Sequence, residues 1–273
     1  MSNRQFRLGL CQLMSRTDKE ENMQRAEAMV REAAAGGASV VVLPEVFQCP
    51  FGHEYFEPYA EPRGGESMRR MAQWANELGI VLVGGSLTEQ DGDKLYNTCY
   101  VFDRDGSLLA DYRKIHMFDV DIPGKVSFRE SDSFASGEDI CVFDTDVGCM
   151  GVAICYDLRF PELMRAMARR GAELILLPAK FTTPTGEAHW DLLTRARALD
   201  NELFFAAVCA ARDPKGQCYG HSLVAGPYGD IKASCDEGEA VLLCDIDLSE
   251  VDRVREQIPA FRTLRDDLYP VAD

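Results

Sequence analysis

The sequence lacks the usual signatures of proteins that bind membranes or nucleic acids. No apolar run approaches the roughly 18 residues of a membrane-spanning helix, and no cluster of lysines and arginines occurs. The chain carries 29 basic against 45 acidic residues, which gives a formal net charge of −16. Such a charge opposes binding to phosphate backbones and to anionic lipid surfaces. We therefore expect no nucleic-acid partner and no membrane partner.

Signatures of metal binding and secretion are also missing. The ten cysteines include no C-x-x-C pair, and the four histidines, at positions 53, 116, 189 and 221, lie far apart. We therefore expect no metal site. Residues 1–10 lack the continuous apolar core of a signal peptide. A reducing compartment is the expected setting, so we predict a cytoplasmic protein.

The chain does contain enough apolar sequence for a large core. Hydrophobic residues make up 46% of its 273 residues, and no linker or change of composition divides it. We therefore expect a single domain over residues 1–273. Strand and helix patterns alternate, which predicts a mixed α/β fold with a mostly parallel arrangement and some antiparallel hairpins. Helices are expected at 22–35, 67–78, 161–170, 188–202 and 249–257.

The expected strands are short and mostly apolar. They lie at 6–13, 39–43, 80–84, 96–103, 108–112, 140–144, 147–154, 173–177, 203–209, 217–226, 231–234 and 240–245. The run at 39–43 is continuously apolar, as in a strand covered on both faces. Asp105-Gly106 predicts a hairpin turn between two of the strands. The polar segment from Asp119 to Glu138 is expected to be a long functional loop.

One stretch, from Gly151 to Glu162, carries the strongest chemical signal. An apolar strand pattern ends at Cys155, and Pro161 fits the first turn of the following helix. Cys155 is therefore expected on a sharp strand-to-helix turn, with the main-chain N–H of Tyr156 directed to where an oxyanion would form. The alternative interpretation is that Cys155 is one more buried structural cysteine.

Two charged residues follow other strands in the same way. Glu45 comes just after the strand at 39–43, and Lys114 follows the strand at 108–112. Each alone could be a solvated surface charge. In open α/β sheets, however, ligands bind at the carboxyl ends of the strands. A carboxylate base, a cation and a thiol nucleophile at one edge would supply what acyl transfer needs.

These residues carry a resemblance to a known family. Leu-Pro-Glu at 43–45, Tyr-Arg-Lys-Ile-His at 112–116 and Ile-Cys-Tyr-Asp-Leu-Arg-Phe-Pro-Glu at 154–162 resemble the nitrilase, or carbon–nitrogen hydrolase, superfamily, with its Glu-Lys-Cys triad. Further stretches are similar to those of Nit2-type omega-amidases, which hydrolyse the terminal amide of 2-oxoglutaramate and 2-oxosuccinamate. They lie at 52–56, 84–86, 95–98, 118–125, 129–131, 189–190, 219–222 and 266–269.

The resemblance implies a fold and a mechanism. The fold would be a four-layer αββα sandwich with mixed sheets, assembled as a homodimer or a larger homo-oligomer, with no cofactor. Glu45 would accept the proton of Cys155, and the thiolate would attack an amide carbonyl. Lys114 and the Tyr156 N–H would hold the oxyanion while ammonia leaves. Water would then hydrolyse the thioester intermediate. Glu130 matches a second glutamate that positions substrate and Lys114.

The segment after the nucleophile departs from the omega-amidase pattern. Lys180 stands where omega-amidases have a small residue, and it is either turned to solvent or a cation facing a substrate carboxylate. Together with Arg159, Thr182 and Thr183 it forms the predicted carboxylate-binding set. The Thr-Pro-Thr at 183–185 is also similar to N-carbamoyl-amino-acid amidohydrolases, which are the alternative enzyme. An alternative of another class is a non-catalytic binding or scaffold protein with the same fold.

Overall fold

The computed structural model describes residues 4–124, 126–265 and 267–268. Lys125, Asp266 and Tyr269, which belong to the motifs named above, lie outside the described residues. Within the described ranges, no helix is long and apolar enough to cross a membrane.

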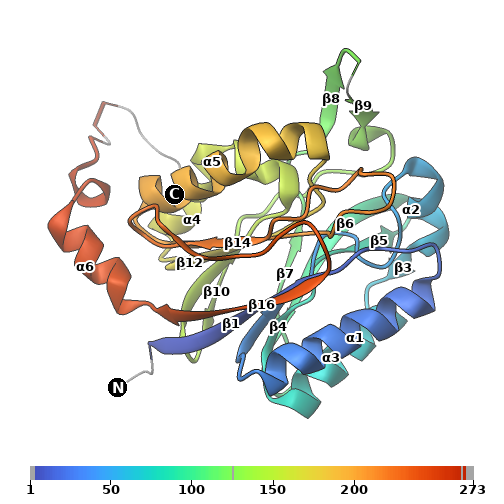
Figure 1. Ribbon diagram of the computed structural model, residues 1–273, viewed down its shortest axis with the longest axis horizontal. Coiled ribbons are helices and arrows are strands. Elements are labelled where there is room, and N and C mark those ends of the chain that lie inside the picture. Colours follow the sequence, from blue (N-terminus) through green and yellow to red (C-terminus); the bar gives the residue numbers. More distant parts are fainter. Residues whose placement is uncertain (1–3, 125, 266, 269–273) are drawn as a thin grey trace.

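Two β-sheets pack face to face, and helices cover their outer sides (Figure 1). Helices α1 (Lys19–Ala35) and α3 (Glu66–Leu78) cover one sheet. Helices α4 (Pro161–Arg169) and α5 (Thr183–Asn201) cover the other. The four layers confirm the predicted αββα sandwich.

The first sheet has eight strands in the described chain and combines both strand directions. Its order is β16-β1-β2-β4-β6-β5-β3, and β7 pairs with β6. The pairs β1–β2 and β2–β4 are parallel, whereas β16, β6 and β7 pair in antiparallel fashion. The strands are β1 (Gln5–Gln12), β2 (Val40–Val42), β3 (Glu61–Pro62), β4 (Val81–Val83), β5 (Leu87–Asp91), β6 (Lys94–Phe102), β7 (Leu108–Arg113) and β16 (Ala240–Asp247).

The second sheet has six strands in the order β10-β11-β12-β13-β14-β15. Its central pairs β11–β12 and β12–β13 are parallel. The strands are β10 (Cys141–Thr145), β11 (Gly148–Val152), β12 (Leu174–Ala179), β13 (Phe204–Cys209), β14 (Leu223–Ala225) and β15 (Ile231–Ser234). The remaining elements are α2 (His53–Tyr59), a hairpin of β8 (Asp119–Ile122) and β9 (Val126–Arg129), and α6 (Ser249–Gln257).

The apolar strand β2 shows why the sandwich forms. Val40 and Val42 point into the core between the sheets, where strand residues of both sheets meet. Val41 points the other way and packs with the buried face of α1, including Met23 and Val30. All three valines have no exposed surface. A strand buried on both faces therefore needs the uninterrupted apolar run that its sequence has.

Several elements differ from the sequence predictions: α1 begins at Lys19 rather than at residue 22, and the sequence patterns did not predict α2 and β5. The polar segment from Asp119 is not a plain loop, because it contains the β8–β9 hairpin, which projects from the sandwich in Figure 1. Helix α5 begins at Thr183 rather than at residue 188, since Pro184 fits the first helical turn. The strand predicted at 217–226 is confined to β14. Glu45, Lys114 and Cys155 follow the carboxyl ends of β2, β7 and β11.

Candidate active site

Three chain segments bring Glu45, Lys114 and Cys155 to one small cavity. Glu45 follows β2 by three residues, Lys114 comes directly after β7, and Cys155 follows β11 by three residues. Their exposed fractions are 0%, 1% and 6%. The structure therefore places all three predicted residues where two facing sheets end, although β2 and β7 belong to one sheet and β11 to the other.

The nucleophile candidate sits in a constrained turn. Cys155 opens a short 3₁₀ helix (Cys155–Arg159), and its φ of 48° lies in the left-handed region that non-glycine residues rarely adopt. Val46, which follows Glu45, has a φ of 41°. Backbone strain of this kind concentrates at functional sites. The turn after β11 therefore agrees with the strand-to-helix turn predicted from the sequence, and the loop after Glu45 carries the same feature.

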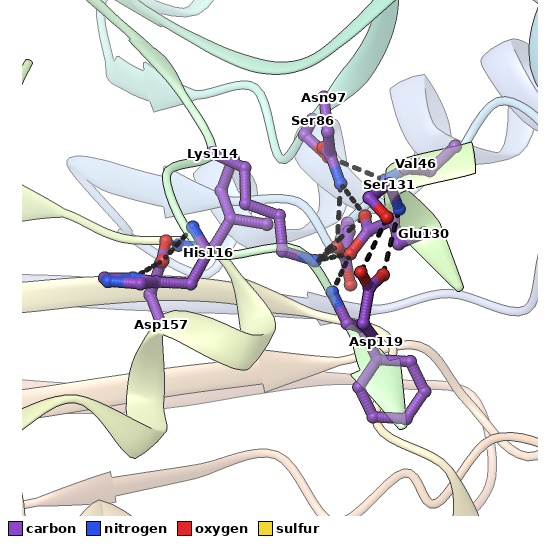
Figure 2. A network of polar contacts seen from close by, with 12 residues as sticks. Val46, Ser86, Asn97, Lys114, His116, Asp119, Glu130, Ser131 and Asp157 are labelled. Atoms are coloured by element: carbon purple, nitrogen blue, oxygen red, sulfur yellow. Dashed lines mark hydrogen bonds and ion pairs between the residues drawn. The ribbon is translucent and has the colours of Figure 1, made fainter. Parts of the chain in front are cut away.

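Lys114 lies between two buried carboxylates. Its Nζ donates to Glu45 Oε1 at 2.8 Å and to Glu130 Oε1 and Oε2 at 3.0 and 2.8 Å. Glu130 has no exposed surface and also accepts the main-chain N–H of Phe118 at 2.7 Å. Figure 2 shows Lys114 reaching into this network. The structure thus brings Glu130 next to Lys114, as the resemblance implied.

Asn97 completes the network, and sequence reasoning assigned it no role. Its Nδ2 donates to Glu45 Oε1 at 2.8 Å and to Glu130 Oε1 at 3.2 Å. Glu45 Oε1 therefore receives two donors, whereas the buried Oε2 has no hydrogen-bond partner among the described residues. Glu45, which lines the cavity, therefore keeps one carboxylate oxygen free to accept a proton.

Burial and charge move three pKa values in this cavity. Burial alone would lower the pKa of Lys114, but the charges of Glu130 and Glu45 outweigh it and raise that pKa well above its ordinary value. Burial raises the pKa of Glu130 despite the opposing charge of Lys114. Burial, followed by the charge of Glu45, raises the pKa of Cys155 well above its ordinary value, against the opposing effects of Lys114 and the Lys180 main-chain N–H. At neutral pH Cys155 is therefore a thiol, and it lies beside the Lys114 cation.

The outer part of the cavity is mostly aromatic. Its lining consists of Phe51, Phe118, Tyr156, Lys180, Phe181, Thr182 and Thr185. Tyr156 thus borders the same space as Cys155. Aromatic side chains provide a surrounding of low dielectric constant, in which electrostatic interactions are stronger than in water. Among the described residues, no group of three or more His, Cys, Asp or Glu side chains could hold a metal ion.

The four predicted carboxylate-binding residues are placed differently. Lys180 is only 6% exposed and lines the cavity, so the interpretation that it turns to solvent is wrong. Its Nζ donates to the main-chain oxygens of Val46 and Cys49 at 3.1 and 2.8 Å. Thr182 also lines the cavity. The hydroxyl of Thr183 instead donates to the main-chain oxygen of Gly216 at 2.6 Å.

Arg159 lies at the rim of the cavity. Its guanidinium carbon is 5.5 Å from the ring centre of Tyr156 and 5.2 Å from that of Phe181, and both rings line the cavity. Its Nη1 is 3.4 Å from His189 Nδ1. Neither Arg159 nor Lys180 has a carboxylate partner among the residues that the structure describes.

Comparison with known proteins agrees with this geometry. The model of the carbon–nitrogen hydrolase family matches residues 7–256. The chain belongs to the carbon–nitrogen hydrolase family. This carbon–nitrogen hydrolase is 47% identical to human omega-amidase NIT2 over 268 residues, which cover 97% of each chain. It is also 47% identical to omega-amidase NIT2 of Xenopus tropicalis over 270 residues, covering 98% of each.

Solved structures support the fold of this carbon–nitrogen hydrolase. Saccharomyces cerevisiae Nit3, a member of branch 10 of the nitrilase superfamily, superposes with a TM-score of 0.87 at 36% identity over 96% of each chain. The NitFhit protein of C. elegans superposes with a TM-score of 0.89 at 36% identity, covering 98% of this chain and 67% of that one. The family predicted from the motifs is therefore confirmed, and with it an enzyme that hydrolyses carbon–nitrogen bonds.

Proposed function

We propose that this enzyme is an omega-amidase that hydrolyses the terminal amide of a short dicarboxylic acid mono-amide, such as 2-oxoglutaramate or 2-oxosuccinamate. The observation that carries the proposal is a cavity lined by a thiol, a carboxylate and a lysine, with two further cations, Lys180 in its lining and Arg159 at its rim, that have no carboxylate partner among the described residues. The first set suits acyl transfer, and the second suits a substrate carboxylate. The near full-length similarity to omega-amidases supports the same substrate class.

The acylation step follows from the positions of these groups. Glu45 Oε2 accepts the proton of the Cys155 thiol while the sulfur attacks the amide carbon. Lys114 Nζ and the Tyr156 N–H stabilise the oxyanion. The proton on Glu45 then passes to the amide nitrogen, the C–N bond breaks, and ammonia leaves a thioester on Cys155. Glu130 and Asn97 hold Lys114 and Glu45 in place throughout.

Hydrolysis of the thioester uses the same base. Glu45 removes a proton from water, the resulting hydroxide attacks the thioester carbon, and the proton returns to the sulfur as the acid leaves. In the acylation step a base is needed because the raised pKa of the Cys155 thiol leaves few thiolates in the free enzyme at neutral pH. Lys114 keeps its positive charge over the whole neutral range, since its pKa is raised.

We further propose that Arg159, Lys180 and Thr182 bind the distal carboxylate. Lys180 and Thr182 line the cavity, and Arg159 lies against its aromatic rim. Lys180 has two main-chain oxygens as partners, so its ammonium retains one N–H for a further acceptor. Thr183, included in the sequence prediction, is left out because its hydroxyl is engaged with a main-chain oxygen.

Ammonia release from a matched substrate panel tests the proposal. The panel contains 2-oxoglutaramate, its methyl ester, an N-carbamoyl amino acid and a neutral aliphatic amide of the same length. We expect the first to be the best substrate by kcat/KM. Faster turnover of the carbamoyl compound, with release of carbon dioxide as well as ammonia, would replace the omega-amidase by a carbamoylase. Equal turnover of the neutral amide would refute a carboxylate-binding site.

We also propose that the enzyme forms a homodimer or a larger homo-oligomer through the outer face of α5. Leu192 and Leu199 of this helix are 66% and 50% exposed, and the adjacent Tyr228 is 59% exposed. Exposed apolar side chains mark an interface where they form one contiguous patch, which is what we propose for these three. Light scattering of the purified protein should give a multiple of 30.4 kDa, and Leu192→Glu should lower it. A monomer in both cases would refute the proposal.

A cytoplasmic location completes the proposed function. All ten cysteines are free, and seven of them are buried. Free thiols in this number are typical of a reducing compartment. Fractionation of the source cells with an antibody would test the location.

A further inference from the structure

A further buried carboxylate, that of Asp157, lies near Glu45, Lys114, Glu130 and Cys155 but is not part of their network. Asp157 follows Cys155 by two residues and has no exposed surface. Four donors surround its two oxygens, and none of them comes from the Glu45 network. We propose that Asp157 is a positioning residue that holds the Lys114 segment in register with the Cys155 turn. The inference rests on the proposed roles of Lys114 and Cys155 but not on the identity of the amide substrate.

The donors come from both sheets of the sandwich. Asp157 Oδ2 accepts the Tyr112 hydroxyl at 2.7 Å and the main-chain N–H of Ile154 at 2.9 Å. Asp157 Oδ1 lies 3.1 Å from the main-chain N of His116, which donates to it, and 2.7 Å from the His116 Nδ1. Tyr112 and His116 stand two residues before and two residues after Lys114. Ile154 directly precedes Cys155. One carboxylate therefore joins the segments that carry the cation and the nucleophile.

The carboxylate also closes the strained turn itself. The Asp157 N–H donates to the main-chain oxygen of Ile154 at 3.1 Å, while the Ile154 N–H donates back to the Asp157 carboxylate. These two hydrogen bonds bracket Cys155, whose φ is 48°. A strained conformation persists only where the surrounding contacts over-determine it. Asp157 supplies such contacts at the residue that must present its sulfur to the substrate.

We call Asp157 and the four groups that bond to it the clamp. On its histidine side, the His116 ring stacks on another aromatic ring. The His116 imidazole lies parallel to the Phe160 ring, with 3.5 Å between ring centres and 9° between planes. Phe160 comes at the end of the same short helix as Cys155. His116 is thus fixed both by the carboxylate and by the segment that follows the nucleophile. Figure 2 shows the His116–Asp157 pair on the side of Lys114 that faces away from Glu130.

Asp157→Asn is the sharpest single test, because it keeps the shape of the side chain. The amide retains one acceptor oxygen, but its NH₂ group replaces the other. The Tyr112 hydroxyl or His116 Nδ1 can turn into an acceptor for that group. A main-chain N–H cannot, so Ile154 or His116 loses its partner whichever way the amide is oriented. A displacement of about 1 Å between reacting groups can cost about a hundredfold in rate.

We therefore expect Asp157→Asn to lower kcat for 2-oxoglutaramate by about ten- to a hundredfold, while KM changes by less than about threefold. Tyr112→Phe removes one of the four hydrogen bonds and should lower kcat by about three- to tenfold. It keeps the buried ring, so it serves if Asp157→Asn fails to fold. Glu61→Gln is the matched control, because Glu61 is a partly buried carboxylate that accepts from Lys19 and Ser67 away from the cavity.

A second readout does not depend on the substrate. Iodoacetamide alkylates Cys155 when the sulfur displaces iodide, and peptide mass spectrometry measures the rate at that residue. We expect Asp157→Asn and Tyr112→Phe to slow this alkylation and Glu61→Gln to leave it unchanged. If 2-oxoglutaramate is not turned over but these alkylation rates differ, the proposed substrate fails and the clamp stands. The proposal would be overturned if Asp157→Asn and Tyr112→Phe fold and leave both kcat and the alkylation rate of Cys155 unchanged. It would also be overturned if Glu61→Gln lowered kcat and the alkylation rate as much as they do.

Discussion

Two groups of residues at the active-site cavity differ in whether their charged side chains have partners of opposite charge. On the inner side, Glu45, Lys114, Glu130 and Cys155 form a cluster, here called the inner cluster, in which each charge meets an opposite charge. On the outer side, Arg159, Lys180 and Thr182 form the outer cluster. Its two cations contact main-chain oxygens and aromatic rings, and no carboxylate among the described residues faces them.

The difference indicates which charged side chains have oppositely charged partners within the protein and which do not. Burying a charge without a partner is costly, and a pair or triad reduces that cost only when its geometry is good. The inner cluster satisfies this condition in the free enzyme. The outer cluster is balanced only when an anion enters, which is why we assign it to the substrate carboxylate. Substitutions in the inner cluster should therefore impair catalysis more than substitutions in the outer cluster.

Loss of the nucleophile should have the largest effect. Cys155→Ala should lower kcat by at least about four orders of magnitude, because no other group can form the thioester. Mass spectrometry of the variant with substrate should show no acyl adduct. Cys149→Ala, which removes a half-buried thiol far from the cavity, is the control and should retain turnover. Comparable activity of both variants would exclude Cys155 as the nucleophile.

Loss of the inner cation should affect both rate and stability. Lys114→Met should lower kcat by about a thousandfold and the free energy of unfolding by about 3–5 kcal/mol, since it leaves two buried carboxylates without a cation. Glu130 already has a raised pKa, so it gains a proton as pH falls, and the stability loss should shrink at lower pH and grow as pH rises. Adding Glu130→Gln should restore part of the stability but not kcat. Thermal unfolding at several pH values measures this, and independent, additive losses would contradict the cluster.

Loss of the base should separate turnover from thiol reactivity. Glu45→Gln should lower kcat by about 10²- to 10⁴-fold. The same change removes a negative charge that raises the pKa of Cys155, so the thiolate fraction at neutral pH should increase and alkylation by iodoacetamide should become faster. The rate of alkylation against pH, in both proteins, gives the shift. Parallel loss of turnover and alkylation would mean that Glu45 does not act as base to a thiol of high pKa.

Loss of an outer cation should depend on the substrate. A charge-assisted hydrogen bond contributes about 1.5–3 kcal/mol, so Arg159→Ala or Lys180→Met should lower kcat/KM for 2-oxoglutaramate by about one to two orders of magnitude. The methyl ester should show much less change in these variants. Steady-state kinetics with the two substrates measure the difference. Equal losses with acid and ester would show that the cation supports the loop rather than the carboxylate.

The smallest expected difference is between two neighbouring threonines. Thr182→Val removes a hydroxyl that lines the cavity and should lower kcat/KM by about three- to tenfold. Thr183→Val removes a hydroxyl at the start of α5 that donates to the main-chain oxygen of Gly216. This change should lower the melting temperature with little change in kcat/KM. A reversed pattern would return Thr183 to the substrate site.

Much of the fold and part of the site could be predicted from local patterns. Strands such as β2, which is apolar throughout, and the break at Cys155 are visible because hydrophobic runs and turn residues act over a few positions. The hairpin within the segment after Asp119 was missed, since its alternation is short and lies among glycine, proline and charged residues. Asn97 was missed for another reason. A polar residue inside a strand gives no local sign of what it faces.

The sequence by itself determined the mixed α/β class and the three segments that end in Glu45, Lys114 and Cys155, because these depend on apolar patterning. Its short motifs determined the family, and the resemblance to that family implied the sandwich. Only the tertiary structure decided which groups share a proton or a charge. Lys180 lies in the cavity rather than in solvent, and Asp157 joins two segments more than 40 residues apart in the chain. Burial and hydrogen-bond partners are properties of packing between distant segments, and no local pattern encodes them.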